Sequence, residues 1–292
     1  MTLSKRSVRN HFNRHAEEYD RYASVQRGLA DWMLEGFEPR VDQVRRILEV
    51  GCGTGYLTEC ILALYPQAEI VAIDIAPAML DVASARIGSD SRVLFVEHDV
   101  EQPLPDSSMT FGKESEPGFD LIISSGTLQW LEHPVETLQL LARALRPGGR
   151  LQIGVFGAGT FRELREAFDE ASRGVGSWSH GPDLRTAVEW ESLFIASGLK
   201  PLQVRVLQMR DTYPSVRHFL KGIQKSGANN AASSDALCRR PSVVRSMMET
   251  YSERFASPEG VFATWEWVCV TAERVSNNLH ELKLAAPGRN SQ

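Results

Sequence analysis

A turn with glycine at every second position, Gly51-Cys52-Gly53-Thr54-Gly55, constrains this chain more than any other segment. It follows the apolar run 47–50 and precedes a segment, 56–65, with helical spacing of apolar residues. Because glycine has no Cβ, such a turn can be tight and its backbone can approach a ligand closely. The N–H groups that open the next helix would face that ligand. The segment therefore predicts a strand, a turn and a helix that bind a ligand together.

The same alternation of strands and helices continues along the chain. Further strands are predicted at 69–73, 93–96, 119–124, 151–156, 204–207 and 261–271. Pro77 is expected to open one helix, and another is expected over 134–145, ending before the Pro-Gly-Gly at 147–149. Helices are also expected at 22–38, 160–172 and 184–196. This order is typical of an α/β fold with a doubly wound, mostly parallel, seven-stranded sheet covered by helices on both faces.

Acidic and polar residues stand where the predicted strands end, and ligands of doubly wound sheets bind there. Asp74 can accept both hydroxyls of a ribose, or it can cap the following helix. Asp99 can accept from an adenine amino group while Val100 covers the ring, or it can be an ordinary loop residue. Ser124 ends the fourth strand. Met79 can cover the adenine or belong to the core.

Composition excludes several classes of protein. The chain has 292 residues with a net charge of -5, which argues against a globally basic nucleic-acid binder. Its four cysteines form no C-x-x-C pair, so neither a metal site nor a disulfide framework is expected. No run approaches the roughly 18 apolar residues of a membrane span. A cytoplasmic protein is expected.

Four ordered segments, LEVGCGTG, AIDIAPAML, EHDV and RALRPGG, resemble the motifs of class I S-adenosylmethionine methyltransferases over about residues 45–155. The resemblance implies a Rossmann-like fold and S-adenosylmethionine as methyl donor, with no metal. In that family the glycine turn holds the methionine end, the second strand's acid binds the ribose, and the third strand's acid binds adenine. The implied donor-binding residues are Glu49, Gly51, Cys52, Gly53, Gly55, Asp74, Ile75, Met79, Asp99, Val100 and Ser124. The glycine spacing differs from the G-x-G-x-x-G of dinucleotide oxidoreductases.

Flanking segments resemble the biotin-synthesis methyltransferases that act on malonyl-acyl carrier protein. They are FNRHAEEYDRYASVQRGLADWML, SSGTLQWLEHP, FGAGTFRELREAF and YPSVRHFLKGIQKSGANN. The chain departs from that family at Ser125, where asparagine is usual, at 224–226, and in a longer loop at 106–118. The resemblance implies methyl transfer to the free carboxylate of a malonyl thioester, with acyl carrier protein as partner and neither nucleic acid nor membrane. A carboxylate with a pKa of about 4 is already ionised at neutral pH, so no general base is expected.

Substrate-side residues follow from the same resemblance. Tyr19 is expected to close over the donor, or to be a helix-packing aromatic. Gln129 and Trp130 lie just after the fourth predicted strand and are expected to wall the pocket, or Trp130 packs in the core. An arginine is expected to bind the substrate carboxylate, or the arginines lie on a solvated face; the candidates are Arg162, Arg165, Arg205 and Arg210. Positive charges at four-residue spacing predict either a docking face for an acidic carrier or a solvated helix face, and they are Arg217, Lys221 and Lys225.

The predicted organisation has an N-terminal helical lid at 1–40 and a methyltransferase domain at 41–280. A helical insertion is expected at about 208–258 and a frayed tail at 281–292. Three alternatives stay open: a methyltransferase for a free small acid such as aconitate, a non-catalytic chain that keeps the fold, and a nicotinamide-linked oxidoreductase.

Overall fold

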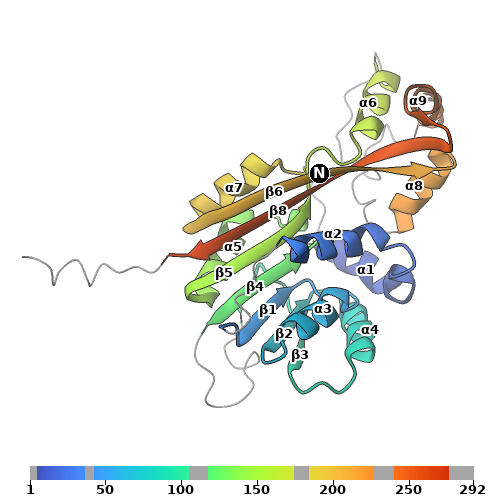
Figure 1. Cartoon of the computed structure of the whole chain (residues 1–292). Helices are drawn as coiled ribbons and strands as arrows, with labels where there is room; N and C mark the ends of the chain where they lie inside the picture. Colours follow the sequence, from blue (N-terminus) through green and yellow to red (C-terminus); the bar gives the residue numbers. More distant parts are fainter. Residues whose placement is uncertain (1–4, 37–42, 105–117, 174–183, 226–239, 276–292) are drawn as a thin grey trace, which may run out of the picture.

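The computed structural model of the chain describes residues 5–36, 43–104, 118–173, 184–225 and 240–275. One sheet runs through these residues in the order β3-β2-β1-β4-β5-β8-β6, with helices on both faces (Figure 1). The strands are β1 (Arg46–Val50), β2 (Glu69–Asp74), β3 (Val93–Glu97), β4 (Phe119–Ser125), β5 (Leu145–Phe156), β6 (Leu199–Tyr213) and β8 (Gly260–Arg274). The two-residue β7 (Ala256–Ser257) pairs with β8 as an eighth strand.

The first five strands are parallel, and β8 lies antiparallel to both β5 and β6. This confirms the predicted doubly wound, mostly parallel α/β sheet. The helices are α1 (Lys5–Tyr19), α2 (Ser24–Glu35), α3 (Tyr56–Leu64), α4 (Pro77–Ile87), α5 (Pro134–Ala144), α6 (Arg162–Ala171), α7 (Ala187–Ala196), α8 (Val216–Lys225) and α9 (Pro241–Arg254), with a 3-10 turn η1 at Leu128–Trp130.

Two strands, β5 and β6, extend far beyond their predicted bounds. The helix over 134–145 was expected to end at Pro-Gly-Gly, but β5 already begins at Leu145 and includes that segment. Leu145 pairs with Phe119, and the register then shifts so that Arg150 pairs with Leu121. Gly149 sits against the backbone, since a Cβ there would lie 2.8 Å from the carbonyl oxygen of Phe119. The Pro-Gly-Gly is therefore a bulge within a strand.

The other underestimated strand is β6, which was predicted only at 204–207. It pairs with β8 along its whole length, from Leu199 opposite Arg274 to Tyr213 opposite Val261. Because β6 is the last strand of the sheet and is largely exposed, it carries polar residues that hide the strand pattern. The helices α8 and α9 of the predicted insertion lie after Tyr213, because β6 includes the residues up to that position. The predicted loop at 106–118, apart from Gly118, and the predicted tail lie outside the described residues.

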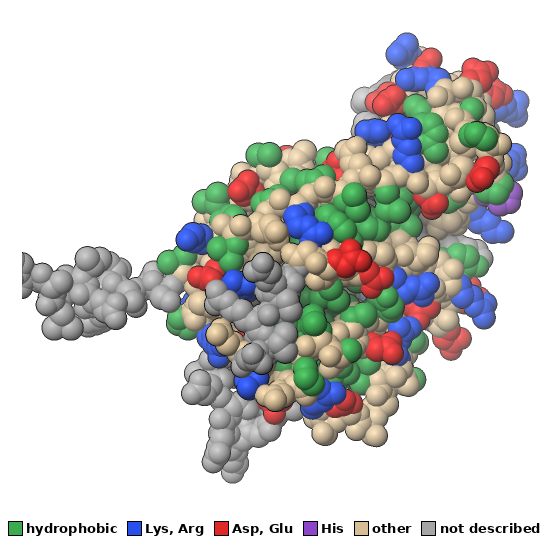
Figure 2. All heavy atoms as spheres, in the orientation of Figure 1, with side chains coloured by type: hydrophobic (Ala, Val, Ile, Leu, Met, Phe, Trp, Pro, Cys, Tyr) green, Lys and Arg blue, Asp and Glu red, His purple; other side chains and the backbone are tan. Residues whose placement is uncertain are grey.

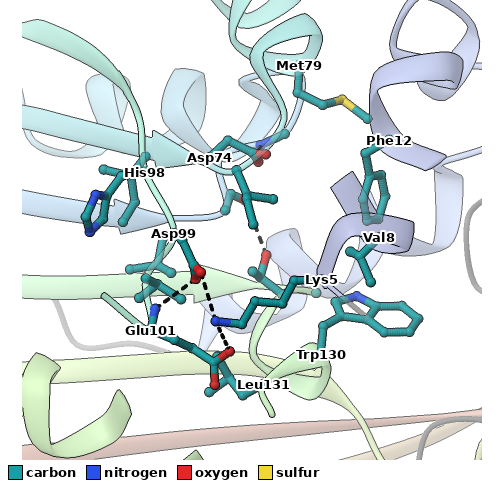
Figure 3. Close-up of a pocket in the computed structure, with 18 of the residues that line it drawn as sticks. Lys5, Val8, Phe12, Asp74, Met79, His98, Asp99, Glu101, Trp130 and Leu131 are labelled. Carbon is teal, nitrogen blue, oxygen red and sulfur yellow. Dashed lines mark hydrogen bonds and ion pairs between the residues drawn. The ribbon is translucent and has the colours of Figure 1, made fainter. Parts of the chain in front are cut away.

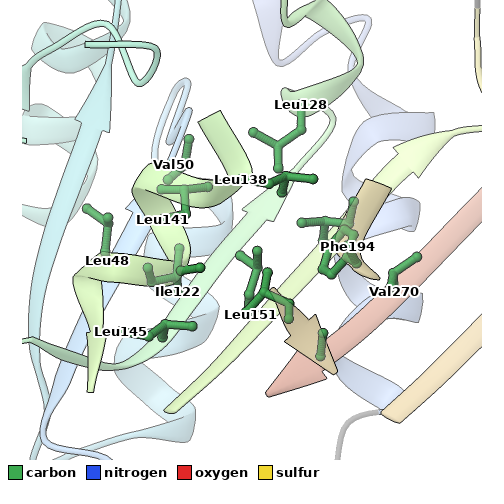
Figure 4. Close-up of a cluster of buried hydrophobic side chains, with 14 of the residues drawn as sticks. Leu48, Val50, Ile122, Leu128, Leu138, Leu141, Leu145, Leu151, Phe194 and Val270 are labelled. Atoms are coloured by element: carbon green, nitrogen blue, oxygen red, sulfur yellow. The ribbon is translucent and has the colours of Figure 1, made fainter. Parts of the chain in front are cut away.

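Alternate side chains of the buried strands pack on opposite faces of the sheet. On one face Leu48, Ile122 and Leu151 meet α5 and α7, where Leu141 and Phe194 are fully buried (Figure 4). The other face packs against α2 and α3. Each fully buried leucine contributes roughly 1.5–3 kcal/mol relative to exposure. This core holds the strands rigidly, and their carboxyl ends lie beneath α1.

Candidate active site

A cavity opens at the carboxyl ends of β1, β2 and β4, with α1 forming its outer wall (Figure 3). It has an empty volume of ≈ 850 Å³, part of which is open to solvent. Its lining is mostly apolar, with a few polar groups that converge from the strand ends. This is the position at which doubly wound sheets bind their ligands.

The glycine turn forms the floor of this cavity. Gly51 and Gly53 line it, and both have positive φ values, 71° and 53°. A Cβ at Gly51 would lie 2.1 Å from the Thr127 hydroxyl, whereas a Cβ at Gly53 would project into open space. Gly55 does not line this cavity; it caps the start of α3 in the left-handed conformation at φ 83°. Gly53 thus leaves free the volume that a ligand can fill.

Asp74 lies at the end of β2 and faces the cavity. Its Oδ2 accepts from the Gly53 amide at 2.9 Å, and its Oδ1 accepts from the Ala76 amide at 2.8 Å. Burial raises the pKa of Asp74, although these backbone donors oppose the shift. Each carboxylate oxygen has a second lone pair for a further donor. The geometry thus allows Asp74 to accept two ligand hydroxyls.

The opposite wall carries an ion-pair network that the sequence pattern did not reveal. Lys5 of α1 reaches Asp99 Oδ2 at 2.8 Å and Glu101 Oε2 at 2.5 Å, as the dashed lines of Figure 3 show. Burial lowers the pKa of Lys5, but the hydrogen bonds to both carboxylates outweigh it and raise the pKa overall. Arg9 of α1 also pairs with Glu97 at 2.5 Å. These contacts hold the N-terminal half of α1 against the cavity.

Apolar side chains form the remaining walls of the cavity. Ile75, Met79 and Val100 line it from the sheet side, and Val8 and Phe12 line it from α1. Met79 is also buried in a small cluster between α1 and α4, so it belongs to the core and lines the cavity at the same time. An apolar slot of this kind suits a flat aromatic ring.

A second, smaller cavity lies behind the glycine turn and shares with the first the walls made by Tyr19, Gly51, Gly53, Ser125 and Gly126. Its lining includes Arg27, Glu49 and Cys52.

Glu49 is the most unusual group in this second cavity. Its Oε2 accepts from the Thr58 hydroxyl at 2.6 Å, while its buried Oε1 has no hydrogen-bond partner. Burial raises the pKa of Glu49 to about 8. An oxygen buried without a partner is costly and marks a place where a ligand donor can bind. Burial also raises the pKa of the Cys52 thiol, so Cys52 is not an activated nucleophile.

Some expected site residues lie beside the cavities without lining them. The Ser124 hydroxyl donates to the Val50 carbonyl at 2.8 Å, and Ser125 lines the cavity instead. Neighbouring strand residues face opposite sides of a sheet, which explains this displacement by one residue. Gln129 is buried and donates from Nε2 to the Gly126 carbonyl at 2.8 Å. Gln129 therefore supports the wall that Trp130 lines.

Tyr19 lies at the junction of the two cavities. Burial raises the pKa of its hydroxyl, and the nearby carboxylates of Asp74 and Asp20 raise it further. Tyr19 also contacts Phe12, with ring centroids 6.0 Å apart. The hydroxyl is thus a neutral group at neutral pH.

The four arginines expected to grip the substrate carboxylate do not line either cavity. Arg165 donates to the carbonyls of Thr160 and Ala158 and thereby holds the turn before α6. Arg162 contacts Glu163, and Arg205 stacks on Trp32. Arg210 lies over the ring of Phe262. Arg27, on α2, does line the second cavity; nothing in its local sequence distinguished it from other surface arginines.

Arg217 and Lys221 are exposed on α8, as the four-residue spacing predicted. Lys225 ends the same helix, and its side chain lies outside the described part. Within residues 5–36, 43–104, 118–173, 184–225 and 240–275, no group of His, Cys, Asp or Glu side chains could hold a metal ion. None of the helices described is long and apolar enough to span a membrane.

Comparisons with known proteins agree with this geometry. Residues 48–151 match the family model described as a methyltransferase domain. S-adenosylmethionine-bound phosphoethanolamine N-methyltransferase 2 of Haemonchus contortus is 16% identical, with a TM-score of 0.55, covering 94% of this chain and 61% of that one. The YcgJ protein of Bacillus subtilis is 16% identical, with a TM-score of 0.54, covering 86% and 99%. These two structures show the fold.

More similar relatives match along almost the whole chain. A malonyl-(acyl-carrier protein) O-methyltransferase of Paenibacillus sp. is 34% identical, covering 93% of this chain and all of the relative. A relative with the same name from Anoxybacillus flavithermus is 34% identical, covering 92% of this chain and 97% of the relative. The chain therefore belongs to the malonyl-(acyl-carrier protein) O-methyltransferase family, and S-adenosylmethionine is its methyl donor.

Proposed function

We infer that this chain transfers the methyl group of S-adenosylmethionine to the free carboxylate of a malonyl thioester carried by acyl carrier protein, an early step of biotin synthesis. The observation that carries this inference is the 34% identity, over 93% of the chain, to a relative of that name. The two cavities at the strand ends support it, because together they suit a donor with an apolar ring, a ribose and a charged amino-acid end.

Each polar group of S-adenosylmethionine finds a residue in the two cavities that suits it. The free lone pairs of Asp74 suit the ribose hydroxyls, and Asp99 suits the adenine amino group. The unpartnered Oε1 of Glu49 suits the ammonium group, and Arg27 suits the carboxylate of the same amino-acid end. Gly53 leaves open space between the two cavities. When bound, S-adenosylmethionine supplies an electrophilic methyl group on a positively charged sulfur.

The protein's part in the reaction is to align the substrates and to exclude water. A malonyl carboxylate is ionised at neutral pH and needs no base. Opposite charges are neutralised during the transfer, so an apolar, closed site favours it. Val8, Phe12 and Trp130 provide apolar walls. We assign residues 1–40 as a lid, with Tyr19 next to the methyl-transfer position.

The basic face of α8 is the proposed docking surface for the acidic carrier. Arg217 of α8 and Arg245 of α9 line the same open groove, and Lys221 follows one turn after Arg217. Figure 2 shows Lys and Arg side chains at the end of the molecule that α6, α8 and α9 form, mixed with acidic ones. Complementary charge would steer the carrier toward this face. The free thiols of Cys52, Cys60 and Cys269 fit the proposed cytoplasmic location.

Methyl transfer from labelled S-adenosylmethionine tests the proposed function. Malonyl-acyl carrier protein, malonyl-coenzyme A and free aconitate are offered side by side. A base-labile methyl ester on the carrier-bound malonyl group is the expected product. Label only on aconitate would move the chain to the enzymes of free small acids. Binding of donor without transfer to any of the three would contradict an enzymatic role on these substrates.

A further inference from the structure

Asp20, the residue directly after α1, joins four segments around the two cavities. Its Oδ1 accepts from the Thr54 hydroxyl at 2.6 Å, within the glycine turn. Its Oδ2 pairs with the Arg86 guanidinium at the end of α4. Its backbone carbonyl accepts from Arg27 Nη1 of α2 at 3.0 Å. One residue thus connects α1, α2, α4 and the turn that lies under the donor.

These contacts bear directly on Tyr19, the neighbour of Asp20 in the chain. Tyr19 is the last residue of α1 and lines both cavities. Thr54 is only 3% exposed, so its hydroxyl has a fixed place in the turn. The Asp20–Thr54 hydrogen bond therefore sets the distance between the side chain over the donor and the backbone beneath it.

The opposite end of α1 is held in a different way. Lys5 and Arg9 bind carboxylates of β3 and of the residues that follow it. Only the Asp20 end of α1 is connected to the glycine turn itself. A shift at this end would move Tyr19 relative to the methyl-transfer position, whereas a shift at the Lys5 end would mainly open the adenine side.

We propose that Asp20 is a positioning residue for the methyl transfer, which acts through Thr54 on the placement of Tyr19 over the donor. The identity of the substrate in this proposal rests on the proposed function. The role of Asp20 rests on its contacts with Thr54, Arg86 and Arg27. Misalignment of reacting groups by about 1 Å can cost on the order of 100-fold in rate. Loss of the Asp20 carboxylate should therefore lower kcat strongly while it changes the melting temperature little.

The chain offers a matched control in Asp90, whose carboxylate pairs with Arg92 at 2.6 Å near the start of β3. The side chain of Asp90 is 28% exposed and that of Asp20 is 31% exposed. Asp90 lines neither of the two cavities. Asp20→Ala and Asp90→Ala thus remove similar ion pairs, and only the first removes a contact to the glycine turn.

Steady-state kinetics on malonyl-acyl carrier protein, with thermal melting of each variant, tests the proposal. Asp20→Ala should lower kcat by about 10- to 100-fold, with a melting temperature close to that of Asp90→Ala, whose kcat stays at the wild-type value. Asp20→Asn keeps an acceptor for Thr54 and should recover most of the lost rate. Thr54→Val should lower kcat, Thr54→Ser should lower it less because it keeps the hydroxyl, and Asp20→Ala with Thr54→Val should lower it no further than Asp20→Ala alone.

Wild-type kcat in Asp20→Ala, or additive losses in the double variant, would overturn the proposal. A wild type without turnover would contradict the proposed function instead. In that case, hydrogen exchange of the amides over residues 5–22 decides the role of Asp20. Faster exchange in Asp20→Ala than in Asp90→Ala supports the anchoring of α1, and equal exchange refutes it.

Discussion

Two carboxyl groups, the half-buried Asp74 and the fully buried Glu49, define the chemistry of the donor site at the residue scale. Asp74 accepts from two backbone amides, whereas Glu49 accepts only from one hydroxyl and keeps an oxygen without a partner. Burial raises the pKa of both groups. A ligand that donates hydrogen bonds and carries positive charge relieves both unfavourable environments. S-adenosylmethionine has a ribose, an ammonium group and a sulfonium, and so meets this requirement.

Asp74→Asn should weaken donor binding while leaving the fold intact. The amide keeps one acceptor oxygen but loses the charge and one acceptor for the ribose. A hydrogen bond to a charged group contributes about 1.5–3 kcal/mol, which corresponds to about 10- to 100-fold in Kd. Calorimetric titration with S-adenosylhomocysteine measures this Kd. An affinity within twofold of the wild type would show that Asp74 does not contact the ribose.

Glu49 should make stability fall as the pH rises. Because its pKa in the folded chain is about 8, above the 4.5 of an unperturbed glutamic acid, the folded chain keeps a proton that the unfolded chain releases between these values. This group alone gives a slope of up to about 1.4 kcal/mol per pH unit. Urea unfolding between pH 5.5 and 7.5 should show a smaller slope in Glu49→Gln than in the wild type. Equal slopes would place the folded pKa of Glu49 near its ordinary value.

Local sequence predicted the cavity residues at the strand ends better than those that come from the covering helices. The glycine turn and Asp74 are tied to strand ends by their neighbours in the chain, and they lie there. Lys5 and Arg27 line the cavities because α1 and α2 pack over the sheet, and no local pattern encodes that packing. The displacement from Ser124 to Ser125 has a simpler cause, since one residue along a strand reverses the side-chain direction.

At the scale of elements, β1 to β4 were predictable because they are short, mainly apolar runs between turns. The edge strand β6 was recognised over only four of its residues, since its exposed positions are polar. The insertion was predicted to be helical, and its helices bury Phe219 and Tyr251 in a cluster that also includes side chains of α6 and β8. The four-residue spacing of the positive charges predicted that Arg217 and Lys221 share one face of α8, and both are exposed.

Reversing charge on α8 should weaken carrier binding without affecting the donor. The double variant Lys221→Glu and Lys225→Glu is expected to raise KM for malonyl-acyl carrier protein by on the order of tenfold at low salt, with a smaller effect at high salt. Its KM for S-adenosylmethionine should not change. Lys200→Glu, on exposed β6, makes the same kind of charge change elsewhere. An equal rise in KM in Lys200→Glu would mean that net charge, and not this face, governs the encounter.

At the scale of the whole molecule, one sheet supports both the hydrophobic core and the donor site. Substitutions in the core should therefore change stability, whereas substitutions at the strand ends should change donor binding. Leu141 of α5 is fully buried against the sheet and lines neither of the two cavities. Leu141→Ala should lower the free energy of unfolding by about 2–5 kcal/mol. Ile195→Ala on α7, where the side chain is 60% exposed, should change it by less than about 0.5 kcal/mol.

The donor should stabilise both of these variants to the same extent. A ligand that binds only the folded chain adds RT ln(1 + [L]/Kd), about 2.7 kcal/mol at 100 times Kd. Because Leu141 packs on the α5 face and the cavities open at the strand ends, Leu141→Ala should keep the wild-type Kd. Urea unfolding with and without S-adenosylhomocysteine measures both quantities. A smaller donor increment in Leu141→Ala than in Ile195→Ala would show that the core beneath β4 and β5 also sets the geometry of the strand ends.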